Sequence, residues 1–322
     1  MWLVFAAGAA CCFGLRGILY QWTSRQPAER NTLLLGVYLC GAVISVILNA
    51  MLGQAWTSGA WAGVAMGFFS FVSNSAMHKG FAVGKASLVA LLAGLPPLVV
   101  VLGALLLWGE RLSLGQAVSF AVILGGGLLI KSAGGLSIRN MNGAQWGLLA
   151  LVAFALTDLS SKQATLWGGE TLPTLVLMYA TGSLFFGLSA WAAAVRERHK
   201  AQAARASLET AASAGPAGYR SGWEESAVAL EETAGGNRTP GWGRSKTMLV
   251  GMAVGITNIT GMIFMMPAMR TGVTGLVSAI IALNALIIML YARVVLREKL
   301  KPLELAGMAF SFGGVLALRL FG

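Results

Sequence analysis

Long runs of hydrophobic residues alternate along the chain with short polar stretches. We distinguish ten such runs, and an α-helix needs about 20 apolar residues to cross a bilayer. The runs cover approximately 2–21, 32–53, 60–80, 84–108, 113–131, 146–166, 171–194, 248–268, 273–296 and 302–321. Backbone groups inside lipid must hydrogen bond to one another, so each run is expected to be helical. The pattern predicts an all-α integral membrane protein with ten transmembrane helices.

Three of these boundaries carry helix-start signals. Ser113 followed by Gln116 forms a capping box that would open the fifth helix. Pro302 suits the first turn of the tenth helix, because a backbone N–H at that position has no partner within the helix. Asn31 is the expected N-cap of the second helix.

The two halves of the chain resemble each other. Residues 61–131, shifted by 188 positions, fall on residues 249–319 without a gap. The shift superposes Gly63 and Gly67 on Gly251 and Gly255, Glu110-Arg111-Leu112 on Glu298-Lys299-Leu300, and Gly125-Gly126 on Gly313-Gly314. We therefore predict one five-helix repeat over residues 1–134 and a second over residues 142–322. Because five is odd, the second repeat must cross the membrane upside down, as in transporters whose halves rock about a central site.

Composition supports a membrane protein and changes the meaning of the charge. The chain is 57% hydrophobic and 11% charged, with a mean hydropathy of +0.73, whereas soluble domains carry about 25% charged residues. A net charge of +11 would suggest nucleic acid in a soluble protein. Here the basic residues lie between apolar runs, so we expect contact with anionic lipid headgroups and no nucleic-acid binding.

The basic residues also bear on orientation. The loops between helices 1–2, 3–4, 5–6, 7–8 and 9–10 hold two, two, two, eight and three of them. The opposite side holds Arg111, Lys162, Arg270 and Arg319. The positive-inside rule then places the 7–8 loop in the cytoplasm and both termini outside.

Residues 196–246, between the seventh and eighth helices, interrupt the second repeat. They are rich in Ala, Gly, Ser, Glu and Arg, and they contain six of the twelve acidic residues of the chain. Such a segment buries little apolar surface, so we expect a polar loop outside the membrane that is disordered or loosely helical.

Side chains able to carry out covalent chemistry are scarce. The chain has two histidines, His78 and His199, and one aspartate, Asp158. Its three cysteines lie in apolar runs without metal-binding spacing. An enzyme would need a group of reactive side chains at one membrane face, and the sequence offers none. We therefore expect no enzyme, no metal and no cofactor.

At this point the sequence resembles the ten-helix EamA-type permeases of the drug/metabolite transporter superfamily. The resemblance covers the chain outside 196–246, and it rests most specifically on Pro96 within the fourth helix, Gly109-Glu110-Arg111-Leu112-Ser113, Gln116, Gly125-Gly126, Glu298-Lys299-Leu300 and Gly313-Gly314. Arg297 departs from the glycine usual in the family, and Asn284 stands where Pro96 predicts a proline. The resemblance implies solute export and cytoplasmic termini. The second implication is the reverse of the charge pattern, so the orientation stays open.

Two charged residues within apolar runs are the first candidates for a solute site. Arg16 lies in the first helix and Asp158 in the sixth. A charge in hydrocarbon costs about 2.5–3.5 kcal/mol even on an insertion scale, so each needs a partner, a cavity or the headgroups. Both lie near a run end, which leaves snorkelling to the headgroups as an alternative. The resemblance implies that the first helix of each half lines a central cavity. We predict that Arg16 and Asp158 contact solute or each other.

Asn74, Asn258 and Asn284 complete the predicted solute-binding set, with hydrogen bonding between helices as the alternative role. Glu110 and Glu298 lie at helix ends and are interpreted as structural turn residues. The methionines of the eighth helix are interpreted as packing residues.

We predict a secondary transporter that exports a small organic solute, such as an amino acid, a metabolite or a drug. It would lie in the cell membrane, inner or plasma, as a multi-pass protein and work by alternating access between its repeats. A lipid-linked-sugar flippase of the same superfamily and a non-transporting scaffold or sensor are the alternatives. The expected partners are the solute and membrane lipids, and a homodimer is left open.

Overall fold

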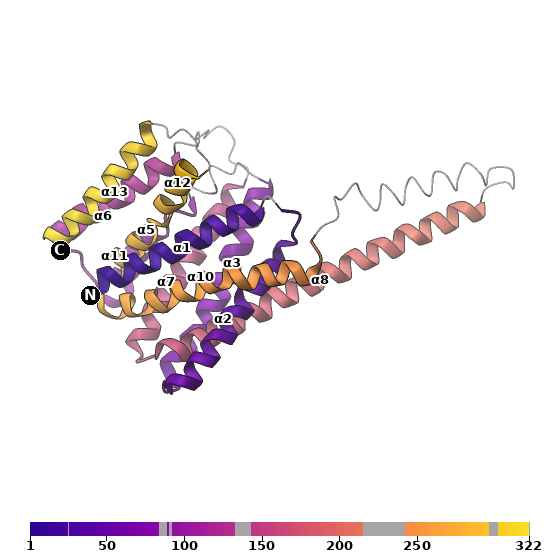
Figure 1. The fold of residues 1–322 in the computed structure, drawn as a ribbon, viewed down its shortest axis with the longest axis horizontal. Coiled ribbons are helices and arrows are strands. Elements are labelled where there is room, and N and C mark those ends of the chain that lie inside the picture. The colour runs from indigo at the N-terminus through magenta and orange to yellow at the C-terminus, as the bar shows by residue number, and fades with distance from the viewer. Residues whose placement is uncertain are drawn as a thin grey trace.

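The computed structural model describes residues 1–24, 26–83, 89, 92–132, 143–214, 242–295 and 302–321. The described chain is helical (Figure 1). The first half contains α1 (Trp2–Ser24), α2 (Arg30–Leu52), the 3-10 turn η1 (Ser58–Trp61), α3 (Ala62–Val83), α5 (Pro96–Trp108) and α6 (Leu114–Ser132). The second half contains α7 (Ala144–Leu166), α8 (Thr171–Ala214), α10 (Arg244–Thr271), α11 (Thr274–Ile281), α12 (Asn284–Val294) and α13 (Pro302–Phe321).

Each of the ten apolar runs forms helix, so the prediction of an all-α membrane fold is confirmed. Five helices are long and apolar enough to cross a bilayer by themselves: α1, α2, α7, α10 and the first 30 residues of α8. Shorter apolar helices account for the fourth, fifth, ninth and tenth runs. The third run, α3, is less apolar because Ser70, Ser73 and Asn74 interrupt it.

The ninth run is broken into two helices, and in the fourth run α5 starts well inside the predicted span. The helix α5 begins at Pro96 with Leu95 as its N-cap. A proline is favoured at this position because its missing N–H would have no partner there. The helix α12 begins at Asn284 with Leu283 as its N-cap. These two starts are 188 residues apart, which is the shift found in the sequence.

The helix-start predictions have mixed outcomes. Ser113 and Gln116 form both bonds of the capping box, with N···O distances of 3.0 and 3.2 Å. Pro302 is the first residue of α13. Asn31 as N-cap is wrong, because α2 begins at Arg30 and Glu29 is its N-cap. The side chain of Asn31 instead donates to the hydroxyl of Ser189 on α8, at 3.3 Å.

The interruption in the second repeat is partly helical. The helix α8 continues to Ala214 and projects beyond the other helices (Figure 1). Of the two states expected for this segment, disordered or loosely helical, residues 196–214 are helical, because Ala, Arg, Glu, Gln and Lys are strong helix formers. At the far end of the segment, α10 begins at Arg244. Residues 215–241 lie outside the described residues.

Glycines allow the central helices to approach closely. A Cβ at Gly63 or Gly67 of α3 would overlap a backbone carbonyl oxygen of α8. A Cβ at Gly251 or Gly255 of α10 would overlap a carbonyl oxygen of α2. Small residues have this role in membrane helix packing, where backbone contact replaces the hydrophobic effect. The result is a core in which α2, α3, α8 and α10 pack together, with α1 against α10 and α7 against α3.

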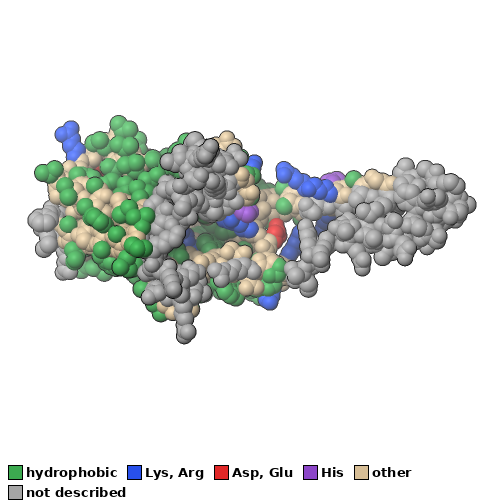
Figure 2. Space-filling view, turned by 90° about the horizontal axis from the view of Figure 1, so that it is seen from above, with side chains coloured by type: hydrophobic (Ala, Val, Ile, Leu, Met, Phe, Trp, Pro, Cys, Tyr) green, Lys and Arg blue, Asp and Glu red, His purple; other side chains and the backbone are tan. Residues whose placement is uncertain are grey.

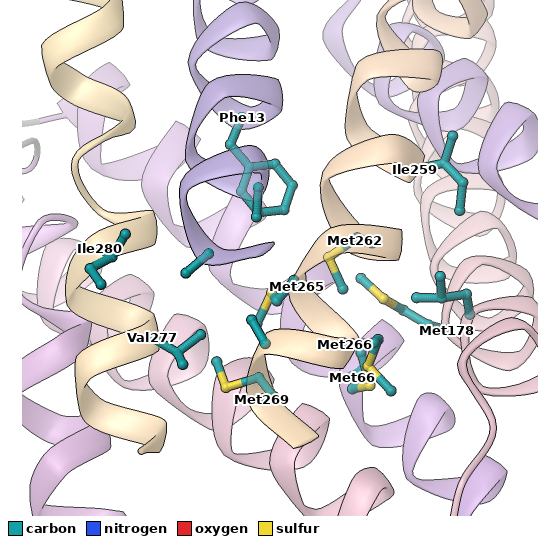
Figure 3. Close-up of a cluster of buried hydrophobic side chains, with 14 of the residues drawn as sticks. Phe13, Met66, Met178, Ile259, Met262, Met265, Met266, Met269, Val277 and Ile280 are labelled. Carbon is teal, nitrogen blue, oxygen red and sulfur yellow. The ribbon is translucent and has the colours of Figure 1, made fainter. Parts of the chain in front are cut away.

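A cluster of methionines fills the centre of this core. Met262, Met265, Met266 and Met269 of α10 are buried and lie among Phe13, Met66, Met178, Val277 and Ile280 (Figure 3). Their thioethers adapt to an irregular space between helices. The interpretation of these methionines as packing residues fits their burial.

The outer surface is apolar. Leu106 of α5 and Leu114 of α6 are 83% and 84% exposed, and hydrophobic side chains cover much of the face seen in Figure 2. Exposed apolar surface on this scale marks contact with lipid. The chain is a multi-pass membrane protein.

Candidate solute-binding site

Arg16 of α1 reaches into the helix bundle. Its guanidinium donates a hydrogen bond to Oδ1 of Asn258 on α10, with an N···O distance of 2.5 Å. Asn258 lies 14 residues after Arg244 and 13 before Thr271, the two ends of α10. At 1.5 Å of rise per residue it is about 20 Å from either end. The charge therefore sits deep between the helices, away from the headgroups that snorkelling would reach.

The bond continues into a chain of polar groups. The amide Nδ2 of Asn258 donates to the hydroxyl of Tyr179 on α8, at 3.0 Å. The ring of Tyr179 meets the ring of Tyr38 on α2 edge-on, with centroids 5.6 Å apart. The hydroxyl of Tyr38 hydrogen bonds to that of Ser70 on α3. Five helices thus contribute to one buried polar layer.

The two tyrosines were missed by sequence reasoning, although a signal was present. Each tyrosine is followed three positions later by a glycine, as Tyr38-Leu-Cys-Gly41 and Tyr179-Ala-Thr-Gly182. A Cβ at Gly41 would overlap the ring of Tyr179, and one at Gly182 would overlap the ring of Tyr38. The repeated Tyr-x-x-Gly therefore lets each ring lie against the opposite helix.

The surroundings of Arg16 are aromatic and neutral. The guanidinium carbon lies 4.6 Å from the centroid of Phe13 and 5.8 Å from that of Tyr20. Such cation–π contacts offset part of the cost of burying a cation, by about 0.5–2 kcal/mol. Among the described residues no carboxylate forms an ion pair with Arg16. Its hydrogen-bond partner is the uncharged amide of Asn258.

Asp158 lies in a different environment. The hydroxyl of Ser278 on α11 donates to its Oδ2 at 2.5 Å, and the carboxyl is partly buried. The two charges of the predicted site are therefore not paired with each other, and each bonds a neutral side chain from another helix. Asp158 shares a face of α7 with Lys162, one helical turn further on.

Lys162 is a further residue of structural importance that sequence reasoning missed. The charge pattern predicts Lys162 at one membrane surface, but it lies within α7 and is 7% exposed. Its ammonium donates to the carbonyl oxygens of Met269 and Gly272 at 3.0 and 3.2 Å. It also lies 3.2 Å from Oε1 of Glu110. In a sequence, a lysine near the end of a membrane-spanning run suggests contact with lipid headgroups. The structural role of Lys162 is shown only by the packing of α10 against α7.

Glu110 is more than a turn residue. It follows α5 and accepts hydrogen bonds from the backbone N–H and the hydroxyl of Thr274, each at 3.0 Å. Thr274 is the first residue of α11. The carboxylate thus meets the positive start of α11, while the ammonium of Lys162 meets the negative end of α10, as helix dipoles favour.

The other two predicted asparagines, Asn74 and Asn284, show no hydrogen bond to Arg16 among the described residues. The amide Nδ2 of Asn74 donates to the carbonyl oxygen of Ser70 in its own helix, at 2.7 Å. This places Asn74 one turn from the Tyr38–Ser70 contact. Asn284 is the first residue of α12, directly after the break in the ninth segment, and is half-buried. Of the five predicted residues, only Arg16 and Asn258 contact each other directly.

Basic groups lie between the Arg16 layer and one end of the bundle. Tyr20 is within electrostatic range of both Arg16 and Arg30, and Arg30 acts in turn on His78. The ammonium of Lys79 lies 4.1 Å from the ring centroid of Trp146. Seen from above, the molecule has a recess near its middle, with Lys and Arg side chains, a His and an acidic side chain beside it (Figure 2).

Comparison with known proteins agrees with this architecture. A family model described as the EamA-like transporter family matches residues 1–132 and 233–320, which is more than half of the chain. One solved structure, described only as "Crystal structure of protein", is 14% identical, with 99% of this chain and 97% of that chain covered and a TM-score of 0.70. At this identity the likeness shows the fold alone. No curated protein matches. Family membership assigns the chain to membrane transporters and not to enzymes, and we conclude that it belongs to the EamA-like transporter family.

Proposed function

We propose that the protein exports a small organic solute, and that the solute binds at Arg16, Asn258 and Tyr179. The observation that carries this proposal is the hydrogen bond from Arg16 to Asn258, deep between the helices. It joins the first half of the chain to the second. Transporters of repeated architecture bind their solute near mid-membrane, where the two halves meet. Because the hydrogen-bond partner of Arg16 there is the neutral amide of Asn258, a solute can take the place of that amide.

We further propose that residues 1–134 and 142–322 act as inverted repeats, with 196–246 as an insertion. Three observations support this. The helix starts at Pro96 and Asn284 share the 188-residue shift. Gly63 approaches α8 as Gly251 approaches α2. Tyr38 bonds Ser70 of α3 as Tyr179 bonds Asn258 of α10. Ser70 and Asn258 are also 188 positions apart.

Alternating access then has a simple physical form. At one end, Lys162 and Glu110 tie α7, the turn after α5, and the junction of α10 and α11 together. At the other end of α7, Lys79 packs on the ring of Trp146, near the start of that helix. The arrangement corresponds to a transporter closed at the Lys162 end. Solute release at that end requires this cluster to open.

Transport by the purified protein in liposomes tests the proposal. Vesicles containing wild-type protein should take up host metabolites that protein-free vesicles exclude. Asn258→Leu should reduce this uptake at least about tenfold, because a charged-group hydrogen bond is worth about 1.5–3 kcal/mol. Arg198→Gln removes an exposed charge on the projecting part of α8 and should leave uptake unchanged. Absence of any protein-dependent flux would favour a scaffold or sensor, and flux of lipid-linked sugars alone would favour a flippase. A homodimer is not needed, since one chain supplies the whole site.

A further inference from the structure

We infer that the solute is an anion, and that its carboxylate or phosphate group binds the guanidinium of Arg16. This inference rests on the proposed function and names its substrate class. The starting observation is an imbalance of charge. A cation lies deep between the helices with an amide oxygen and two aromatic rings as its described partners. Even a partly buried cation is costly without a counter-charge, so an anion that reaches it gains more there than in water.

The donors of Arg16 are underused. A guanidinium has five N–H groups in a planar fork, which matches the two oxygens of a carboxylate or phosphate. One of these donors bonds Asn258. Replacing a neutral amide oxygen by an ionised one roughly doubles the strength of such a bond. Asn258 would keep its second bond, from Nδ2 to the hydroxyl of Tyr179.

Two carboxylates of the described bundle, Asp158 and Glu110, are engaged elsewhere. Asp158 accepts a hydrogen bond from Ser278, and Glu110 is bound by Lys162 and Thr274. Among the described residues, no carboxylate therefore pairs with Arg16, which leaves room for the carboxylate or phosphate of a solute.

Basic side chains at the open end of the bundle carry the same positive charge as Arg16. Arg30 and Lys79 lie toward that end, with Tyr20 between Arg30 and Arg16. Glu29 opposes them, but it is exposed and accepts a hydrogen bond from Thr32 at 2.6 Å. A low-dielectric opening lined by one sign of charge concentrates ions of the other sign. Anions would thus be both attracted and bound.

The test uses liposomes of neutral phosphatidylcholine that contain the full-length protein. They are incubated with a deproteinised extract of host metabolites, washed, and analysed by mass spectrometry in both ionisation modes. Wild type and Arg198→Gln should accumulate carboxylates or phosphate esters. Arg16→Gln, which keeps a donor for Asn258, should lower that accumulation about 10- to 100-fold. Arg16→Lys keeps the charge without the fork and should retain an intermediate level.

The outcomes separate the two proposals. Accumulation of cationic or neutral solutes that survives in Arg16→Gln overturns the anion inference and leaves the transporter proposal standing. Absence of any accumulation overturns both. Anionic lipid headgroups present the same chemistry, so a second set of vesicles contains phosphatidylglycerol. If Arg16-dependent thermal stabilisation follows phosphatidylglycerol and no soluble anion accumulates, Arg16 binds lipid and the inference is wrong. A variant that fails to fold is recognised by its unfolding curve, and Arg16→Lys then carries the test.

Discussion

The ammonium of Lys162 lies 3.2 Å from Oε1 of Glu110, although the two residues come from different halves of the chain. The pair sits where α10 ends and α11 begins, with the cation on the carbonyl oxygens of Met269 and Gly272 and the anion on the N–H of Thr274. Each charge therefore compensates both its partner and a helix end. Removing one charge would leave the other partly buried and unpaired.

We expect Lys162→Met and Glu110→Gln each to lower the free energy of unfolding by about 1–3 kcal/mol, because each leaves a buried polar group without its partner. The double variant should be less destabilised than the sum of the two, since it removes both charges together. Unfolding in detergent, followed for all three variants, measures this coupling. Strictly additive losses would show that the two charges do not depend on each other.

Asp158→Asn should impair transport more than membrane insertion. Asparagine keeps the shape and can still accept the hydrogen bond of Ser278, so only the charge is lost. Liposome uptake compared with the amount of folded protein in the membrane measures the effect. Ser278→Ala is the matched control, since it removes the bond and keeps the charge. Normal uptake by Asp158→Asn would mean that Asp158 has no part in transport.

Gly126→Ala should destabilise the protein by about 1–3 kcal/mol through overpacking. A Cβ at Gly126 would lie 2.6 Å from the carbonyl oxygen of Gly307 and from the backbone nitrogen of Ser311, both on α13. Gly125→Ala is the control in the neighbouring position, where a Cβ meets nothing within 4 Å. It should be neutral or stabilise by about 0.5–1 kcal/mol, because alanine favours helix. Equal effects of the two variants on thermal unfolding would contradict the α6–α13 packing.

Deleting residues 200–240 and joining the ends by a flexible linker should leave folding and uptake largely intact. The described part of this segment is the end of α8, which projects away from the other helices (Figure 1). Trp242 should be kept, because its N–H donates to the carbonyl oxygen of Pro27 at 2.9 Å and its ring packs on Trp22. Membrane expression and liposome uptake are the measurements. Loss of expression would reveal a folding role for the segment.

Both termini should lie outside the cell, with the projecting end of α8 in the cytoplasm. Because Lys162 is buried, the outer side keeps Arg111, Arg270 and Arg319 as its basic residues, which strengthens the charge asymmetry. In a chain whose native cysteines are replaced, Ser58→Cys should react with an impermeant thiol reagent on intact cells. Ser207→Cys should react only after permeabilisation. Both positions are exposed. The opposite labelling pattern would support the orientation that the family resemblance implies.

The sequence alone determined that the chain is helical and approximately where its ten apolar segments lie. Each apolar run must be long enough to cross the bilayer, so the ends of the helices can be located from the hydrophobicity along the chain. The interruptions within the fourth and ninth runs were harder to predict from the sequence. Pro96 predicts an interruption in the fourth segment, whereas Asn284 interrupts the ninth without a proline. For residues 196–214 the sequence left disorder and loose helix as alternatives, and the structure shows helix, in keeping with their helical propensity.

The partners of the buried charges were decided by tertiary structure. Arg16 and Asn258 were each recognised as polar residues inside helical runs, but they are 242 positions apart and nothing local pairs them. Lys162 looked like a loop charge until α10 and α11 brought carbonyl oxygens and Glu110 to it. A polar residue in a helix must find a partner, and its identity depends on which face each helix turns inward. That choice is made by close glycine contacts between helices of both halves, which no single stretch of sequence contains.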